Sequence, residues 1–187
     1  MLRNVSAARA ITQKLAYADH HDALTGLPNR LLLESRLAQA IALARRHNCE
    51  AAVLFLDLDR FKPVNDTLGH AVGDRLLELV ARLLQRCVRI TDTVSRFGGD
   101  EFVVLLSEIS RPAAAVAFAE KILGALRVPH SVAQHSLLVT ASIGIGLYPH
   151  DGTDPQTLLR NADDAMFHAK RSGGNTCQLW SRSGKCH

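Results

Sequence analysis

The feature that most limits the fold of this chain is an apolar run that ends in charge. Residues 51–58 read AAVLFLDL, a nearly continuous series of apolar side chains. The run is too short for a buried helix, so it predicts a central strand that is covered on both faces. It ends in Asp57-Leu58-Asp59-Arg60, and residues two apart on a strand point the same way. The strand is therefore expected to present two carboxylates to one site at the end of a sheet.

Patterns on both sides of this run predict a layered domain. We expect helices over 31–48, 76–87, 111–127 and 155–171, a loop over 60–71, and strands at 93–97, 102–106, 130–133, 137–147 and 176–180. Gly98-Gly99 forms the turn of a β-hairpin between the strands at 93–97 and 102–106. The order of elements predicts an α/β (α+β sandwich) fold with a ferredoxin-like βαββαβ core and a mostly antiparallel central sheet. Gly144 and Gly146 share one strand face, which indicates close backbone packing there.

The length of 187 residues suits one main domain, over 23–180, with short appendages. Residues 1–22 carry small and apolar side chains at a/d spacing, which predicts a linker helix or coiled-coil stub, with a frayed tail as the alternative. Residues 181–187 are expected to be a tail. We expect a cytoplasmic chain, since it has no signal-peptide pattern, no membrane-length apolar stretch and no paired cysteine motif. The parent protein can still be membrane-anchored.

Two acidic segments could bind hard metal ions. Asp57 stands at the strand end, and Asp100 and Glu101 follow the Gly-Gly turn on what should be a neighbouring strand. Mg²⁺ binds through one or two carboxylates together with substrate phosphates, and pairs of metal ions serve displacement at phosphorus. Each segment alone would be read as a solvated strand end or surface hairpin.

Polar residues downstream of the strand suit a guanine nucleotide. Lys62 can pair with a phosphate, and an Asn with an Asp, here Asn65 and Asp74, can bind the edge of guanine. Asp74 could instead cap a helix, and His70 is ambiguous by itself.

Several motifs, in one order, resemble the GGDEF family of diguanylate cyclases. They are DALTGLPNR at 22–30, DLDRFKPVND at 57–66, LGHAVGD at 68–74, RFGGDEF at 96–102, and ADDAM with AK within 162–170. The resemblance covers roughly residues 20–180, and it makes 23–180 a GGDEF catalytic domain with a fold like the palm of nucleotidyl cyclases and polymerases. It implies condensation of two GTP into cyclic di-GMP and two pyrophosphates, at a homodimer interface with one half-site per chain. The implied cofactors are two Mg²⁺ or Mn²⁺ ions per half-site.

The resemblance also implies a role for each matching residue. Asp57, Asp100 and the carbonyl of Leu58 would hold the metals. Glu101 would add a carboxylate or orient the site, and Asp100 or water around it would help to deprotonate the attacking 3′-hydroxyl. Asn65 and Asp74 would bind guanine, Lys62 and Lys170 the triphosphate, and His70 is placed in the same GTP site.

Two further comparisons with the family concern regulation and affinity. Arg89 and Asp92 form an RxxD motif that resembles the family's product-inhibition site, where Lys121 could also contact cyclic di-GMP. Gly174 stands where a phosphate-binding Arg is common, so we expect somewhat weaker GTP binding. Arg171, three residues earlier on a helix, should point elsewhere.

Two other functions remain open from the sequence. One is a non-catalytic module that senses GTP or cyclic di-GMP and regulates a neighbour, and the other is a different two-metal nucleotidyl transferase with a palm-like sheet. The metal acids and both glycines of the turn are present, which favours catalysis. The resemblance further implies fusion to a sensor or an EAL phosphodiesterase domain, and no nucleic-acid partner.

Overall fold

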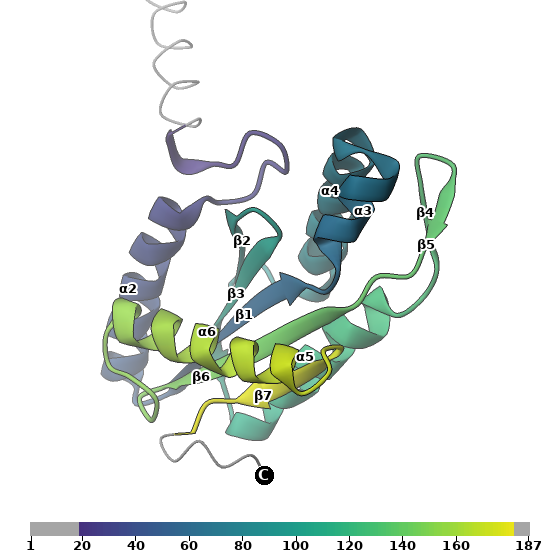
Figure 1. Ribbon diagram of the computed structural model, residues 1–187. Coiled ribbons are helices and arrows are strands. Elements are labelled where there is room, and N and C mark those ends of the chain that lie inside the picture. The colour runs from purple at the N-terminus through teal and green to yellow at the C-terminus, as the bar shows by residue number, and fades with distance from the viewer. Residues whose placement is uncertain (1–18, 182–187) are drawn as a thin grey trace, which may run out of the picture.

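The computed structural model describes residues 19–181, and its elements are labelled in Figure 1. The linker helix expected at 1–22 and the tail at 181–187 lie almost wholly outside the described residues. The helices are α2 (Arg30–His47), α3 (Phe61–Leu68), α4 (His70–Cys87), α5 (Pro112–Leu126) and α6 (Pro155–Arg171). The strands are β1 (Glu50–Leu58), β2 (Thr93–Gly98), β3 (Glu101–Ile109), β4 (His130–Val132), β5 (His135–Leu137), β6 (Ala141–Tyr148) and β7 (Thr176–Leu179).

Five strands form the central sheet, in the order β2-β3-β1-β6-β7, and β4 and β5 form a separate hairpin. All neighbours in the central sheet are antiparallel except β6 and β7, which are parallel. The run β1-α4-β2-β3-α5-β6 gives the spatial order β2-β3-β1-β6, as in ferredoxin-like folds. The predicted fold class and its mostly antiparallel sheet are therefore confirmed.

Helices cover both faces of the sheet, as the buried run in β1 requires. Figure 1 shows α6 across the front of the sheet and α5 behind it. Leu54 and Leu56 of β1 belong to the apolar core that includes α4 and α5, whereas Val53 and Phe55 pack with α2 and α6. Because side chains alternate along a strand, Asp57 points to the same face as Val53 and Phe55, toward α6.

Two sequence predictions about local structure are wrong. The loop expected over 60–71 contains the helix α3, since Pro63 falls in its first turn, where proline is tolerated. Phe61 and Val64 of this helix pack against the core, and this contact offsets the free-energy cost of forming a short helix. The strand expected over 137–147 is divided into β5 and β6, and β5 pairs with β4 outside the central sheet.

Close packing of β6 against α6 is confirmed at Gly144. A Cβ on this glycine would overlap the backbone carbonyl of Ala162 and the backbone nitrogen of Met166. A Cβ on Gly146 would come within 3.1 Å of the carbonyl oxygen of Leu158. The two glycines thus set the distance at which α6 lies on the sheet. Within residues 19–181, no helix is both long and apolar enough to cross a membrane.

Candidate active site

The ends of β1 and β3 bring the predicted metal-binding acids together. Asp57 faces Glu101 across the antiparallel ladder, and the amide of Leu58 donates a hydrogen bond to the carbonyl of Asp100 at 3.3 Å. Lys170 reaches over from α6, and its Nζ lies 2.7 Å from Oδ1 of Asp57. The side chain of Asp57 is 11% exposed and that of Lys170 is 43% exposed, so the pair lies at the border of core and solvent.

Burial and crowding of like charges shape the protonation of this cluster. Burial raises the pKa of Asp57 above its ordinary value, and the charges of Asp100 and Asp59 add to the effect, although the hydrogen bond from Lys170 opposes it. Burial likewise raises the pKa of Glu101, and the carboxylates of Asp163 and Asp57 raise it further. Burial alone would lower the pKa of Lys170, but the hydrogen bond and the negative charge of Asp57 raise it overall. Extra positive charge is therefore favourable here.

Asp59, the second carboxylate of the strand end, has other partners. Its Oδ1 accepts a hydrogen bond from the hydroxyl of Ser142 at 2.7 Å, and its Oδ2 accepts one from the amide of Asn175 at 2.8 Å. Asp59 thus joins β1 to β6 and to the loop after α6. Its two oxygens are used in structural bonds, which differs from the expectation that both strand-end acids serve one site.

Arg96 fixes the Gly-Gly turn, a role that sequence reasoning missed. Its guanidinium donates to the carbonyl oxygen of Gly99 at 2.7 and 3.0 Å and to both carboxylate oxygens of Asp22 at 3.1 Å. Although burial raises the pKa of Asp22, hydrogen bonds from Thr25 and Arg96 lower it overall. Gly99 has a positive φ of 47°, and the bonds to its carbonyl hold that conformation. Asp22 and Arg96 lie in two of the sequence motifs described above, at 22–30 and 96–102. Those motifs were therefore the sequence signal for this pair.

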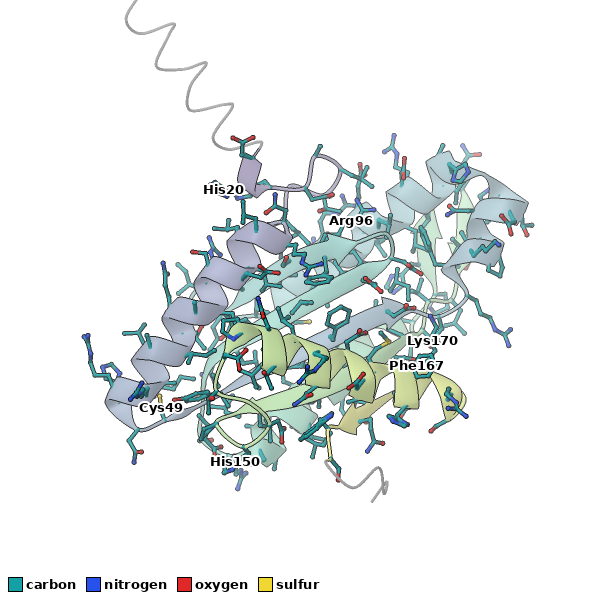
Figure 2. The ribbon with its side chains drawn as sticks, turned by 60° about the vertical axis from the view of Figure 1, so that its left-hand side comes forward. His20, Cys49, Arg96, His150, Phe167 and Lys170 are labelled. Carbon is teal, nitrogen blue, oxygen red and sulfur yellow. The ribbon has the colours of Figure 1, made fainter. Side chains whose placement is uncertain are left out.

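Of the residues predicted to bind GTP, Lys170 contacts Asp57 at the β1 end, and the others lie on α3 and α4, which follow β1 in the chain. Figure 2 shows Arg96 and Lys170 at one end of the sheet, and Cys49 and His150 at the other. Lys62 and His70 are exposed on α3 and at the start of α4.

Asn65 and Asp74 occupy the junction of α3 and α4. The Oδ1 of Asn65 is buried and accepts no hydrogen bond from the described residues. It lies against Gly73, where a Cβ would overlap it. A buried acceptor without a donor is unfavourable, and this atom has almost no accessible surface in the structure. The alternative that Asp74 caps a helix is wrong, because α4 begins at His70 with Gly69 as its N-cap.

Arg89, Asp92 and Lys121 line one cavity of about 480 Å³, away from the β1 end. The backbone amide of Arg89 donates to Oδ2 of Asp92 at 3.0 Å, which shapes the turn of the RxxD motif. The Nζ of Lys121 donates to the carbonyl of Cys87 at 3.0 Å, on the edge of the same cavity. Glu108 also lines it and adds a negative charge. The three predicted residues are thus brought together.

The oxygen donors at the β1 end fit a magnesium ion. Within the described part of the chain, no three His, Cys, Asp or Glu side chains are grouped as a ready metal cluster. Mg²⁺ rarely uses an all-protein cage and takes one or two carboxylates together with phosphates and water. Asp57 and Asp100 could provide two such carboxylates. Burial, and then the neighbouring charge of Asp100, raise the pKa of Asp57, so a bound cation would favour its ionised form.

Gly174, which stands where an arginine is common in the motif that this chain resembles, lies in the loop after α6 in a conformation that favours glycine. Gly174 has a φ of 73°, and a Cβ there would lie 3.0 Å from the carboxylate of Asp59. The guanidinium of Arg171 lies 5.9 Å from the ring centre of Phe167. Arg171 therefore contacts Phe167 on its own helix, in line with the expectation that its side chain does not replace the arginine missing at position 174.

Comparison with known proteins gives consistent matches over most of the chain. The family described as diguanylate cyclase, GGDEF domain, matches residues 19–176. The bifunctional diguanylate cyclase/cyclic di-GMP phosphodiesterase MucR of Pseudomonas aeruginosa is 49% identical over 170 residues, which are 91% of this chain and 24% of MucR. The diguanylate cyclase TpbB of the same species is 43% identical over 166 residues, which are 88% of this chain and 38% of TpbB. The chain thus spans between about a quarter and two fifths of these curated relatives.

A solved structure agrees with the sequence matches. The GGDEF domain of TpbB from Pseudomonas aeruginosa, in a form that comprises only this domain, superposes with a TM-score of 0.85 at 42% identity. The superposition covers 87% of this chain and 95% of that one. The likeness therefore extends over essentially the whole of a single domain.

Proposed function

The chain belongs to the GGDEF domain family, and from that premise we propose that it is a diguanylate cyclase, which condenses two GTP into cyclic di-GMP. The observation that carries the proposal is the register of β1 against β3. It sets Asp57 opposite Glu101 and the backbone of Leu58 against that of Asp100, with Lys170 on Asp57. This cluster combines hard oxygen donors and a cation at one rigid strand end.

The residues of the site divide between the base and the phosphates of GTP. Asn65 and Asp74 bind the guanine edge, since an amide and a carboxylate together offer the donors and acceptors that guanine needs, and Asp74 has no capping role. Lys62 and Lys170 contact the triphosphate, and His70 belongs to the same GTP site. Lys170 exchanges its bond to Asp57 for phosphate oxygens when the nucleotide binds, because both partners are anionic and the lysine end is solvent-accessible.

Asp57, the carbonyl of Leu58 and Asp100 would hold the divalent ions, Mg²⁺ or Mn²⁺. Bound there, two such ions would neutralise charge on the phosphates and on the leaving pyrophosphate. Asp100, or water around it, helps to deprotonate the 3′-hydroxyl, with Glu101 orienting the site. The 3′-oxygen then bonds to the α-phosphorus of the facing GTP, and the bond from that phosphorus to pyrophosphate breaks. Two such steps close the ring, so two chains must pair with their half-sites facing.

The test is incubation of the protein with GTP and Mg²⁺, followed by chromatography for cyclic di-GMP. We expect product from the wild type and none from Asp100→Asn, with Glu78→Gln on the surface of α4 as a control that retains activity. Absence of product from a version tethered as a dimer, when binding of GTP is retained, would refute catalysis. It would leave the non-catalytic sensing module as the function.

Regulation by product is favoured by the cavity that Arg89, Asp92 and Lys121 line. An arginine and a lysine beside an aromatic ring, Phe118, suit a ligand that carries both phosphates and bases. We expect cyclic di-GMP to inhibit the enzyme and Arg89→Ala to raise the inhibition constant roughly tenfold or more, as loss of a charged contact should. An unchanged inhibition constant would refute this site.

A further inference from the structure

The loop that follows α6 is held by an arginine from a different helix. Arg127 is the C-cap residue of α5. Its Nε donates to the side-chain Oδ1 of Asn175 at 2.9 Å, and its second terminal nitrogen donates to the backbone oxygen of Asn175 at 2.9 Å. Two bonds from one planar guanidinium to one residue fix the orientation of that residue as well as its position.

Asn175 in turn is tied to the strand that carries the candidate metal-binding acid. Its backbone amide donates to Oδ2 of Asp59, two residues beyond Asp57. Asp59 is itself fixed, because its Oδ1 accepts from Ser142 and its amide donates to the carbonyl of Thr140 at 2.9 Å. A continuous series of hydrogen bonds therefore runs from the end of α5, through Asn175, to the end of β1.

The same loop closes the end of α6, where Lys170 lies. The amide of Gly173 donates to the carbonyl of Lys170 at 3.3 Å, and the amide of Gly174 donates to the carbonyl of Ala169 at 3.2 Å. Gly173, Gly174 and Asn175 all have positive φ, at 115°, 73° and 52°. Positive φ is ordinary for the two glycines, whereas Asn175 is the non-glycine residue of the three and is held by its bonds to Arg127 and Asp59.

We propose that Arg127 is a positioning residue for the GTP site, which holds the Lys170 end of α6 against the end of β1 by clamping Asn175. The inference rests on the proposed function only in the identity of the ligand. Arg127 itself touches neither Asp57 nor Lys170 in any described hydrogen bond, and it acts through the loop. The guanidinium fork is needed as well as the charge, because two acceptors on one residue must be met at once.

The test compares three variants with a control of the same type. Arg127→Ala removes the clamp, Arg127→Lys keeps the charge without the fork, and Asn175→Gly removes Oδ1 while it tolerates the positive φ. Arg111→Ala, at the opposite end of α5, is the control, since the side chain of Arg111 makes no capping bond. The affinity for a non-hydrolysable GTP analogue with Mg²⁺ is measured by calorimetry on each protein, together with the thermal midpoint.

We expect binding of the analogue to weaken roughly tenfold in Arg127→Ala, which loses both bonds, and in Arg127→Lys, which cannot make both at once. The control should change affinity by less than about twofold. The thermal midpoints should match that of the control, because an exposed pair adds little to stability. The double variant of Arg127→Ala with Asn175→Gly should bind no more weakly than the weaker single variant, since both act through one contact.

Amide hydrogen exchange tests the bond between Arg127 and Asn175 independently of ligand binding. Arg127→Ala should speed exchange of the Asn175 amide, which the bond to Asp59 protects, and the control should not. If the wild type binds the analogue and Arg127→Ala binds it equally well, the positioning role is refuted. If the wild type itself does not bind the analogue, the proposed function fails, and the exchange result then shows separately whether the clamp exists.

Discussion

Replacing Gly144 by alanine would place a methyl group inside the backbone of α6. The added Cβ would overlap the carbonyl of Ala162 and the amide nitrogen of Met166, and it would lie 2.8 Å from the Cα of Met166. None of these atoms belongs to a flexible side chain, so α6 must move away from β6. Overpacking of this kind usually costs about 1–3 kcal/mol, and a clash with backbone alone places the substitution at the upper end, about 3 kcal/mol.

Gly146→Ala is the matched control, because it adds the same methyl group two residues along the same strand face. Its Cβ would lie 3.1 Å from the carbonyl oxygen of Leu158 and 3.5 Å from Cβ of Ala162, which a small adjustment relieves. We expect a loss of about 1 kcal/mol there.

The assay is urea unfolding followed by circular dichroism. If the free energy of unfolding falls by about 2 kcal/mol per molar urea, Gly144→Ala should lower the urea midpoint by roughly 1.5 M and Gly146→Ala by roughly 0.5 M. The dependence on urea concentration should be unchanged in both variants. Affinity for the GTP analogue should fall in Gly144→Ala as well, since α6 carries Lys170. Equal midpoints for the two variants would refute the claim that the backbone contact at Gly144 sets the position of α6.

Other substitutions probe a helix, the Gly-Gly turn and the buried carboxylates. Gly124→Ala in α5 meets open space and should raise the free energy of unfolding by about 0.5–1 kcal/mol, seen as a higher urea midpoint; a lower one would contradict it. Arg96→Ala loses the bonds to Gly99 and Asp22 and should cost about 1.5–3 kcal/mol in the same assay, whereas no loss would show that the turn holds itself. Burial and neighbouring carboxylates raise the pKa of Glu101, so the folded state binds this proton more tightly and stability falls as pH rises from the unfolded toward the folded pKa. In the presence of a chelator, Glu101→Gln should therefore have a higher melting temperature than the wild type near about pH 7, but not near about pH 3. The reverse order would contradict this direction of the pH dependence.

Much of the candidate site was predictable because it depends on local pattern. The buried run in β1 could only be a central strand, and its acidic end had to meet the hairpin after Gly98-Gly99. The acids Asp57 and Glu101 consequently lie opposite each other, as expected. The helix α3 was missed because the short segment contains Pro63, while the core contacts of Phe61 and Val64 exist only after folding.

The sequence by itself determined the central strand β1, the hairpin turn, the covered faces of the sheet and the candidate residues for binding a nucleotide. Only the tertiary structure decided which distant residues hold them in place. Arg96 meets Asp22 across 74 positions of the chain, and Asn175 meets Asp59 across 116. Arg127, an exposed residue at a helix end, has no pattern that distinguishes it from a solvated arginine. Strand and helix periodicity arise from neighbours in the chain, whereas these bonds depend on how helices and loops pack on the sheet, which no local pattern records.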